Sequence, residues 1–239
     1  MPIKRPPLVN GEIYHIVIRA IEGSRLFRDR GDYLRIIHDL FVFNDESPAA
    51  SSYRNTINRS RTVLDSFIEE RKPRKLLVEI LAFCLMPNHV HLLVRQVKDG
   101  GISKFMRKIG AGYGGYCNKK YQRSGHLFQG KYRIVHIKDD KQLITVFVYI
   151  HTNPVAIIST RWKEGGIKIK DLNKVAGFIE QEYRWSSYPD YLSNNNFPSV
   201  TSREWLINEL GGVKAAQRFV NDWLQTKKEL ADFGQVAVE

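Results

Sequence analysis

The stretch LLVEILAFCLMPNHVHLLVR, residues 76–95, decides how the centre of this chain folds. Residues 76–85 form a nearly continuous apolar run of strand length, and HVHLLVR at 89–95 alternates in polarity as a strand does. Between them stands Met86-Pro87-Asn88, which has the Pro and Asn typical of tight turns. A strand, a tight turn and a second strand predict an antiparallel hairpin whose first strand lies in the core.

The second strand of this hairpin carries two histidines, His89 and His91, separated by Val90. Side chains at positions i and i+2 of a strand point to the same face, about 6.5–7 Å apart along the strand. Two imidazoles in this arrangement can bind one cation, and a strand is a rigid platform for ligands. The pair alone also fits a sheet face on which two histidines merely pack, which is commoner than a metal site.

The remaining periodicities place the hairpin in a larger α+β unit. Strands are expected at 13–19 and 131–138, and helices at 29–43, 102–121 and 139–150. The resulting order is strand, helix, strand, strand, helix, strand, helix. It predicts an α+β sandwich, with helices packed on a mainly antiparallel β-sheet.

Charge and cysteine content narrow the classes of partner and compartment. The 239 residues include 37 Lys and Arg against 25 Asp and Glu, a formal net charge of +12 that favours a polyanionic partner. Cys84 and Cys117 fall on apolar stretches and are interpreted as small buried hydrophobes of a reducing compartment. No apolar run approaches the roughly 18 residues of a membrane span, and residues 1–10 lack a signal-peptide stretch. We therefore expect a cytoplasmic protein without a membrane partner.

The segment VYIHTNPV, residues 148–155, supplies a second pair of polar side chains. On a helix, Tyr149 and Asn153 are related as i and i+4 and share one face. The apolar stripe of this helix falls on other positions, so the phenol and the amide can approach the histidine pair together. Pro154 disfavours helical geometry at Asn153, so a distorted last turn is expected. Taken alone, the segment also fits a half-buried tyrosine and an Asn at the helix end.

Three segments, in this order and spacing, resemble a known family. MPNHVHLL at 86–93, RSGHLFQGKYR at 123–133 and YIHTNPV at 149–155 closely resemble the single-tyrosine HUH transposases, where HUH denotes His, a hydrophobic residue and His. The nearest branch is that of the REP-associated tyrosine transposases. The resemblance extends over about residues 8 to 190, from GEIYHIVIR at 11–19 through LFRDRGDYLRIIHDL at 26–40 to WSSYPDYL at 185–192.

The resemblance implies a ferredoxin-like or RRM-like HUH nuclease fold and a single-stranded DNA transposase or endonuclease. Such an enzyme cleaves and rejoins DNA at or near hairpin, REP-like sequences through a 5′-phosphotyrosine intermediate. Tyr149 matches the nucleophile, His89 and His91 match the catalytic metal ligands, and Asn153 matches the residue that completes the metal site. The family uses Mg²⁺ or Mn²⁺, whereas imidazole ligands alone would favour softer metals such as Zn²⁺.

Basic and aromatic side chains that suit single-stranded DNA surround these motifs. Neutralisation of the backbone and stacking of bases are the interactions expected of them. The candidates are Arg123, His126, Lys131, Tyr132 and Arg133 in the second motif, with Lys104, Arg107 and Lys108 on the preceding helix. Alternatively, the first group is only a solvated basic loop, and the second is only the solvent-exposed face of a helix.

Other side chains compete for the catalytic roles. Tyr113, Tyr116 and Tyr121 are rival nucleophiles, although the first two fall on the apolar stripe of their helix, where core packing is the simpler role. His15 and His126 are possible extra ligands; packing on the first strand is the simpler role for His15, and contact with DNA or solvent for His126. The WSSY segment at 185–188 either packs on the core or recognises DNA.

The resemblance also suggests a domain organisation. We expect an HUH tyrosine transposase catalytic domain over residues 1–160, with an insertion at about 44–75, and a mixed, largely helical C-terminal extension over 161–239 with helices near 202–210 and 213–231. A catalytically silent domesticated transposase that binds hairpin DNA, a replication or relaxase-type nickase and an RNA-binding module are the rival functions. Both a monomer and a homodimer are compatible with the sequence.

Overall fold

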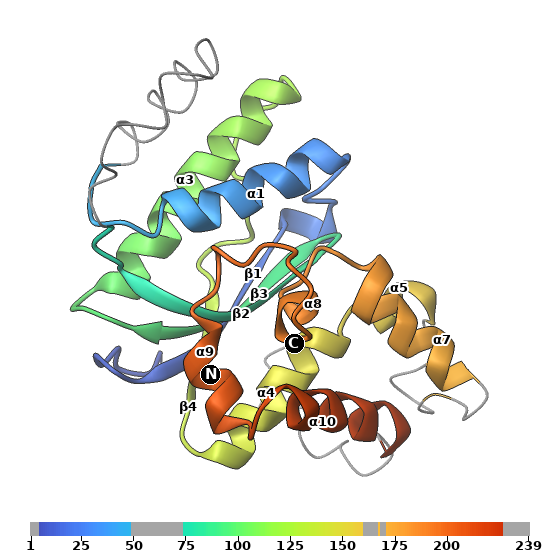
Figure 1. Ribbon diagram of the computed structural model, residues 1–239. Coiled ribbons are helices and arrows are strands. Elements are labelled where there is room, and N and C mark those ends of the chain that lie inside the picture. Colours follow the sequence, from blue (N-terminus) through green and yellow to red (C-terminus); the bar gives the residue numbers. More distant parts are fainter. Residues whose placement is uncertain (1–4, 49–73, 160–166, 168–170, 227–239) are drawn as a thin grey trace, which may run out of the picture.

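The computed structural model describes residues 5–48, 74–159, 167 and 171–226 (Figure 1). The strands are β1 (Ile13–Arg19), β2 (Val78–Met86), β3 (His89–Gln96) and β4 (Arg133–Ile137). The helices are η1 (Ile21–Gly23), α1 (Arg30–Val42), α3 (Gly101–Lys120), α4 (Asp140–Thr152), α5 (Val155–Ile158), α7 (Leu172–Gly177), η4 (Phe178–Glu182), α8 (Tyr188–Tyr191), α9 (Arg203–Glu209) and α10 (Val213–Thr226). Most of the insertion expected at about 44–75 lies outside the described residues.

The four strands form one antiparallel sheet in the order β2-β3-β1-β4. The predicted hairpin is present, with Met86 opposite His89 across its turn. Read from the other edge, this order is the 4-1-3-2 arrangement of a ferredoxin-like sheet, and the α+β class predicted from the sequence is confirmed.

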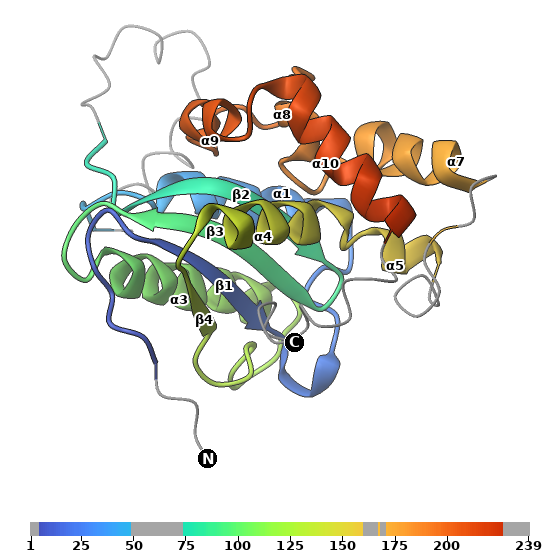
Figure 2. The ribbon, with the colours of Figure 1, turned by 90° about the horizontal axis from the view of Figure 1, so that it is seen from below.

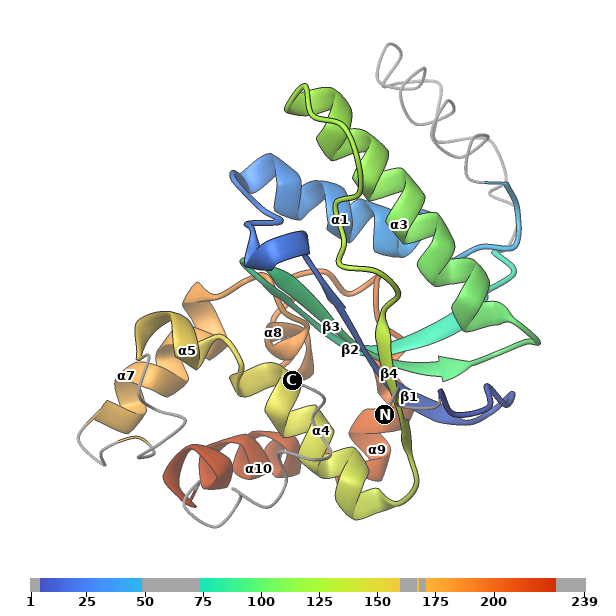
Figure 3. The same ribbon diagram turned by 180° about the vertical axis from the view of Figure 1, so that it is seen from behind.

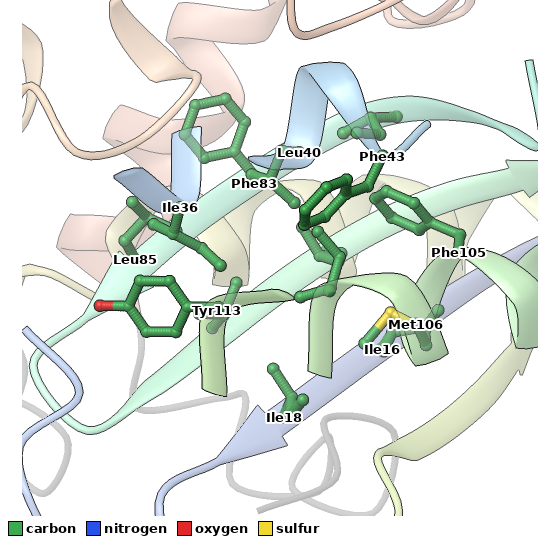
Figure 4. Packing of buried hydrophobic residues seen from close by; sticks show 14 of the residues in the cluster. Ile16, Ile18, Ile36, Leu40, Phe43, Phe83, Leu85, Phe105, Met106 and Tyr113 are labelled. Atoms are coloured by element: carbon green, nitrogen blue, oxygen red, sulfur yellow. The ribbon is translucent and has the colours of Figure 1, made fainter. Parts of the chain in front are cut away.

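Helices α1 and α3 cover one face of the sheet (Figure 1). Helix α1 begins at a capping box, in which Asp29 and Asp32 each accept a hydrogen bond from the other's backbone N–H. Its apolar side chains, with those of α3, pack on Ile16, Ile18 and Phe83 of the sheet (Figure 4). The apolar faces of these two amphipathic helices therefore pack on one apolar face of the sheet.

One of the glycines of α3 permits the close packing of α1 against α3. A Cβ atom added at Gly112 would lie 2.2 Å from Cε2 of Phe43, so only glycine fits without a shift. At Gly110 and Gly115 an added Cβ would meet nothing within 4 Å. Of these three glycines, Gly112 is therefore the one that α1 approaches closely.

Helix α4 and the C-terminal helices form the layer on the opposite face. Figure 2 shows α4 and α10 on the side of the sheet away from α3. Helix α4 begins at Asp139, whose side chain accepts from the Gln142 N–H. The buried side chains of α4, the C-terminal segment and this face of the sheet form one apolar cluster. The domain boundary near residue 160 stays a prediction.

The segment that contains WSSY covers the outer edge of β2. The Leu85 N–H donates to the Trp185 carbonyl over 2.9 Å, and the Ser187 N–H donates to the Phe83 carbonyl over 3.0 Å. The Tyr191 hydroxyl adds a 2.6 Å hydrogen bond to the Leu81 carbonyl. These bonds satisfy backbone groups that an edge strand would otherwise expose. Ser186, Ser187 and Tyr188 are buried, so of the two roles considered for this segment the structure shows packing on the core.

Two further expectations can be compared with the described residues. Cys84 and Cys117 are buried free thiols, as predicted. Among the residues that the structure describes, no helix is both long enough and apolar enough to span a membrane.

Candidate active site

The two histidines of β3 point to the face of the sheet that α4 covers. His91 pairs with Cys84 of β2 and with Val17 of β1, and it is fully buried. His89 lies at the start of the strand and is partly exposed. The ring centroids of His89 and His91 are 4.7 Å apart and their planes are nearly perpendicular, at 80°. The i, i+2 spacing thus brings both imidazoles to one place, as the strand pattern predicts.

Helix α4 brings Tyr149 to this pair within the same chain. The centroid of the partly buried Tyr149 ring lies 5.5 Å from that of His91, at an interplanar angle of 87°. It lies 6.1 Å from the centroid of His15. Because α4 packs directly on β2 and β3, no second subunit is needed to place the phenol beside the imidazoles.

The amide of Asn153 contacts the same histidine. Its Nδ2 lies 3.2 Å from His91 Nε2, and the side chain is buried. The backbone of Asn153 remains helical at φ −53° and ψ −39°, and its N–H donates to the Tyr149 carbonyl. The prediction of a distorted last turn at Asn153 was therefore wrong. Packing overrides the local preference: the chain continues through Pro154 into the short helix α5.

His15 is a member of the site whose position the sequence did not reveal. Its Nε2 lies 3.0 Å from His91 Nδ1, and the two rings stack with centroids 5.2 Å apart. Burial lowers the pKa of His15 to about 3, so the ring is neutral. His91 is consequently held between His15 on one side and Asn153 on the other. His15 contacts Nδ1 of His91, whereas Asn153 contacts Nε2. This arrangement suits a residue that orients His91 better than one that binds the same metal.

These side chains fit a divalent cation in one protonation pattern. Two ligand atoms about 2.1 Å from a metal and at right angles are about 3 Å apart, which is close to the 3.2 Å between His91 Nε2 and the Asn153 amide. Because the amide oxygen and nitrogen of Asn are assigned from hydrogen bonding, rotation of the Asn153 amide would present its oxygen at this point. His89 Nδ1 contacts Asn88 Oδ1 at 2.7 Å, so His89 would use Nε2.

The protonation pattern depends on His15. A lone pair on His91 Nε2 requires the proton on Nδ1, which then donates to His15 Nε2. Among the described residues there is no group of three or more His, Cys, Asp or Glu that could hold a metal. A cation at this place would therefore need the Asn153 amide, together with water or substrate oxygens.

The rival tyrosines lie on the other side of the sheet, on or directly after α3. Tyr113 is fully buried and donates to the Leu26 carbonyl over 2.9 Å. Tyr116 and Tyr121 donate to the carboxylate of Asp32, over 3.0 Å and 2.6 Å. The hydroxyls of Tyr116 and Tyr121 therefore join α3 and the residue after it to α1, and that of Tyr113 joins α3 to the segment before α1.

The candidate DNA-binding residues divide between the two faces. Strand β4 lies beside β1 at the edge of the sheet (Figure 3). Its Arg133 pairs with Val17, which pairs with His91, so Arg133 is on the face of the histidines. Lys104 and Lys108 of α3 instead donate to backbone carbonyls of Glu46 and Asp45 on the opposite side. Arg107, on the same helix, is exposed.

The loop between α3 and β4 carries the other candidates. Exposed His126 lines a cavity of about 330 Å³ with the glycines of α3, and Arg123 donates to the His126 carbonyl. Exposed Lys131 precedes Tyr132, over whose ring the Arg5 guanidinium lies at 4.4 Å. The structure thus does not gather all candidates into one surface.

Comparison with known proteins adds to this geometry. Residues 50–153 match the family model described as "Transposase IS200 like". No curated protein matches the chain. A solved structure titled "Structure of the REP associates tyrosine transposase bound to a REP hairpin" is similar at 16% sequence identity and a TM-score of 0.48, over 84% of this chain and 92% of that one.

The matched stretch contains both histidines, Tyr149 and Asn153, and it ends at Asn153 itself. The side chains that the fold brings together are thus those of the matched segment, with His15 added from β1. Residues 50–153 are thus similar in sequence to the IS200-like transposases, and the similarity covers every one of these side chains except His15.

Proposed function

We propose that this protein is a transposase that cleaves and rejoins single-stranded DNA at or near hairpins, with Tyr149 as the nucleophile and a 5′-phosphotyrosine as the intermediate. The observation that carries the proposal is the placement of the Tyr149 ring across His91, with the Asn153 amide on the same imidazole. A phenol, two imidazoles and an amide converge from a strand and a helix that are packed on each other. Such rigid support is what a reacting constellation needs.

The reaction exchanges one phosphodiester bond for another. The Tyr149 oxygen forms a bond to phosphorus, and the bond from phosphorus to the 3′ oxygen of the preceding nucleotide breaks. The phenol loses its proton to water or a base, and the departing 3′ oxygen takes one up. Because the phosphotyrosine is an ester, attack by a 3′-hydroxyl reverses the step, and strands are joined without a further energy source.

His89, His91 and Asn153 would hold a divalent cation, Mg²⁺ or Mn²⁺. When bound, it would supply positive charge beside the phosphate oxygens and favour the phenolate form of Tyr149. The protein's own contribution is orientation. His15 fixes the ring of His91, Asn88 fixes the ring of His89, and the i, i+4 relation fixes Asn153 beside Tyr149.

The direct test uses a pool of single-stranded oligonucleotides, each with a hairpin and randomised flanks. The pool is labelled at the 3′ end and incubated with Mn²⁺, with Mg²⁺ or with a chelator. The wild-type protein should form an adduct that survives denaturation and carries the 3′ label. A 5′ label should instead appear in a shorter free fragment whose 3′-hydroxyl a polymerase can extend.

Tyr149→Phe should abolish the adduct, whereas Tyr121→Phe is the matched control and should retain it. An adduct that persists in Tyr149→Phe would move the nucleophile to another tyrosine. Binding of the pool without an adduct under any metal condition would contradict the enzyme and favour the silent hairpin-binding protein. An adduct that carried the 5′ label instead of the 3′ label would contradict the proposed 5′-phosphotyrosine linkage.

A further inference from the structure

Arg19, the last residue of β1, lies beside the histidine pair. In the antiparallel register of β1 and β3, Arg19 is directly opposite His89, and Val17 is directly opposite His91. Directly paired residues of an antiparallel sheet project to the same face, with Cβ atoms about 4.5–5.5 Å apart. The side chain of Arg19 therefore leaves the sheet on the face that carries both imidazoles and Tyr149.

The backbone around Arg19 is held on two sides. The Arg19 carbonyl accepts from the Gln129 N–H over 2.9 Å, and the N–H of Ala20 donates to the Asn88 carbonyl over 2.9 Å. Asn88 is also the residue whose side chain contacts His89 Nδ1. Arg19 and His89 are thus tied through one turn residue, and their relative position is set by the sheet and by this turn.

The charge of Arg19 has no partner among the residues that the structure describes. Its Nε is buried without a hydrogen-bond partner, and no ion pair or hydrogen bond joins its side chain to any residue in the described part of the chain. Arg35, by contrast, is bound to Asp39 at 2.9 Å. A guanidinium stays charged at all relevant pH values, and keeping a partly buried charge without a partner is costly. An anionic ligand would supply the hydrogen-bond acceptors that the described residues do not.

We propose that Arg19 is a further catalytic residue, which binds a non-bridging oxygen of the scissile phosphodiester opposite the His89–His91 pair. This inference rests on the proposed function, because it assigns the anion to the same reaction. The planar guanidinium donates from adjacent N–H groups and so matches a phosphate better than an ammonium group does.

Arg19 acts electrostatically and does not transfer a proton. While the bond from Tyr149 to phosphorus forms and the bond to the 3′ oxygen breaks, negative charge is shared among the non-bridging oxygens. A fixed donor in a partly dehydrated site stabilises that charge without reorganising. Removal of one such donor typically lowers the rate about 100- to 1,000-fold.

The first measurement is the single-turnover rate of adduct formation on the labelled hairpin pool. Arg19→Met keeps the length and the apolar stem, and it should lower the rate about 100-fold or more. Arg19→Lys keeps the positive charge but not the paired N–H donors of the guanidinium, so its rate should lie between those of Arg19→Met and the wild type. Arg30→Met is the matched control, because Arg30 is exposed at the start of α1 on the other side of the sheet. It should react at the wild-type rate.

The second measurement requires neither metal nor reaction. In the Tyr149→Phe background and with a chelator, the binding constant for the hairpin pool is followed against salt concentration. Loss of one phosphate contact should reduce the slope of log K against log salt by about 0.7 for a single strand. Arg19→Met should show this reduction, and Arg30→Met should not. Thermal melting without DNA should be no lower in Arg19→Met than in the control.

The outcomes separate the two proposals. If the wild type forms the adduct but Arg19→Met forms it equally fast with an unchanged salt slope, the assignment of Arg19 is overturned while the proposed function stands. If the rate falls only together with a lower melting temperature and an unchanged slope, Arg19 is structural and the assignment is again overturned. If the wild type forms no adduct but the slope still falls with Arg19→Met, the proposed function fails and Arg19 remains a phosphate contact.

Discussion

His15 Nε2 lies 3.0 Å from His91 Nδ1, on the side of that imidazole away from Asn153. The neighbouring strand therefore supports the histidine that the hairpin supplies. Partners of this kind fix the tautomer and the orientation of a metal-binding imidazole, and their loss typically costs 10- to 100-fold in metal affinity. His15 is a positioning residue in this scheme.

Replacing His15 by Phe should weaken Mn²⁺ binding about 10- to 100-fold, because the ring volume is kept but the acceptor for His91 Nδ1 is lost. Titration of Mn²⁺ by electron paramagnetic resonance measures this directly. His136→Phe is the control, since His136 contacts Glu12 and stacks on Tyr14, which belongs to the α1 and α3 side of the sheet. Equal Mn²⁺ affinities for the wild type and His15→Phe would refute the orienting role.

Buried histidines should make the protein sensitive to mild acid. Burial lowers the pKa of both His15 and His151 to about 3, so both stay neutral in the folded chain, while the unfolded chain takes up protons below about pH 6.5. The free energy of unfolding should therefore be constant above about pH 6.5. Below it, stability should fall by about 1.4 kcal/mol per pH unit for each histidine.

Urea unfolding between about pH 7.5 and about pH 5 tests this dependence, because the window lies above the usual pKa of Asp and Glu. His151→Phe removes one of the two groups and should reduce the slope contributed by the pair by about half. A slope identical to that of the wild type would show that His151 is not responsible.

The hydroxyl of Ser187 connects α4 to the edge of the sheet. Its Oγ accepts from the Phe83 N–H over 2.9 Å and lies 2.8 Å from His151 Nε2. Ser187→Ala leaves both buried groups without this partner and should lower the free energy of unfolding by about 1–3 kcal/mol. Chemical denaturation gives the value, with Ser24→Ala, an exposed serine, as the neutral reference. A change no larger than that of Ser24→Ala would mean that water replaces the hydroxyl.

Two glycines of α3 should respond in opposite directions to alanine. Gly112→Ala places a methyl group 2.2 Å from the Phe43 ring and should destabilise the fold by about 1–3 kcal/mol. Gly115→Ala meets nothing within 4 Å and should stabilise the helix by up to about 1 kcal/mol. Thermal or urea unfolding of the pair measures both. Equal effects would disprove the packing of α1 on Gly112.

Local patterns in the sequence predicted most of the elements. Alternation identified β1 and β3, helical periodicity identified α1, α3 and α4, and the Pro-Asn turn identified the hairpin. The i, i+2 relation of His89 and His91 and the i, i+4 relation of Tyr149 and Asn153 depend only on strand and helix geometry. The functional roles of these four side chains stay predictions until the adduct and metal experiments are made.

The sequence by itself determined which side chains share a face within one element, because that depends on a repeat of two or of 3.6 residues. Only the tertiary structure decided which faces meet. It placed His15 against His91 and Arg19 against His89 through the register of β1 and β3, and the two members of each pair are 70 or more positions apart in the chain. It also placed residues 183–191 along the edge of β2. Such pairings arise from the joint packing of the whole core, so no local pattern encodes them.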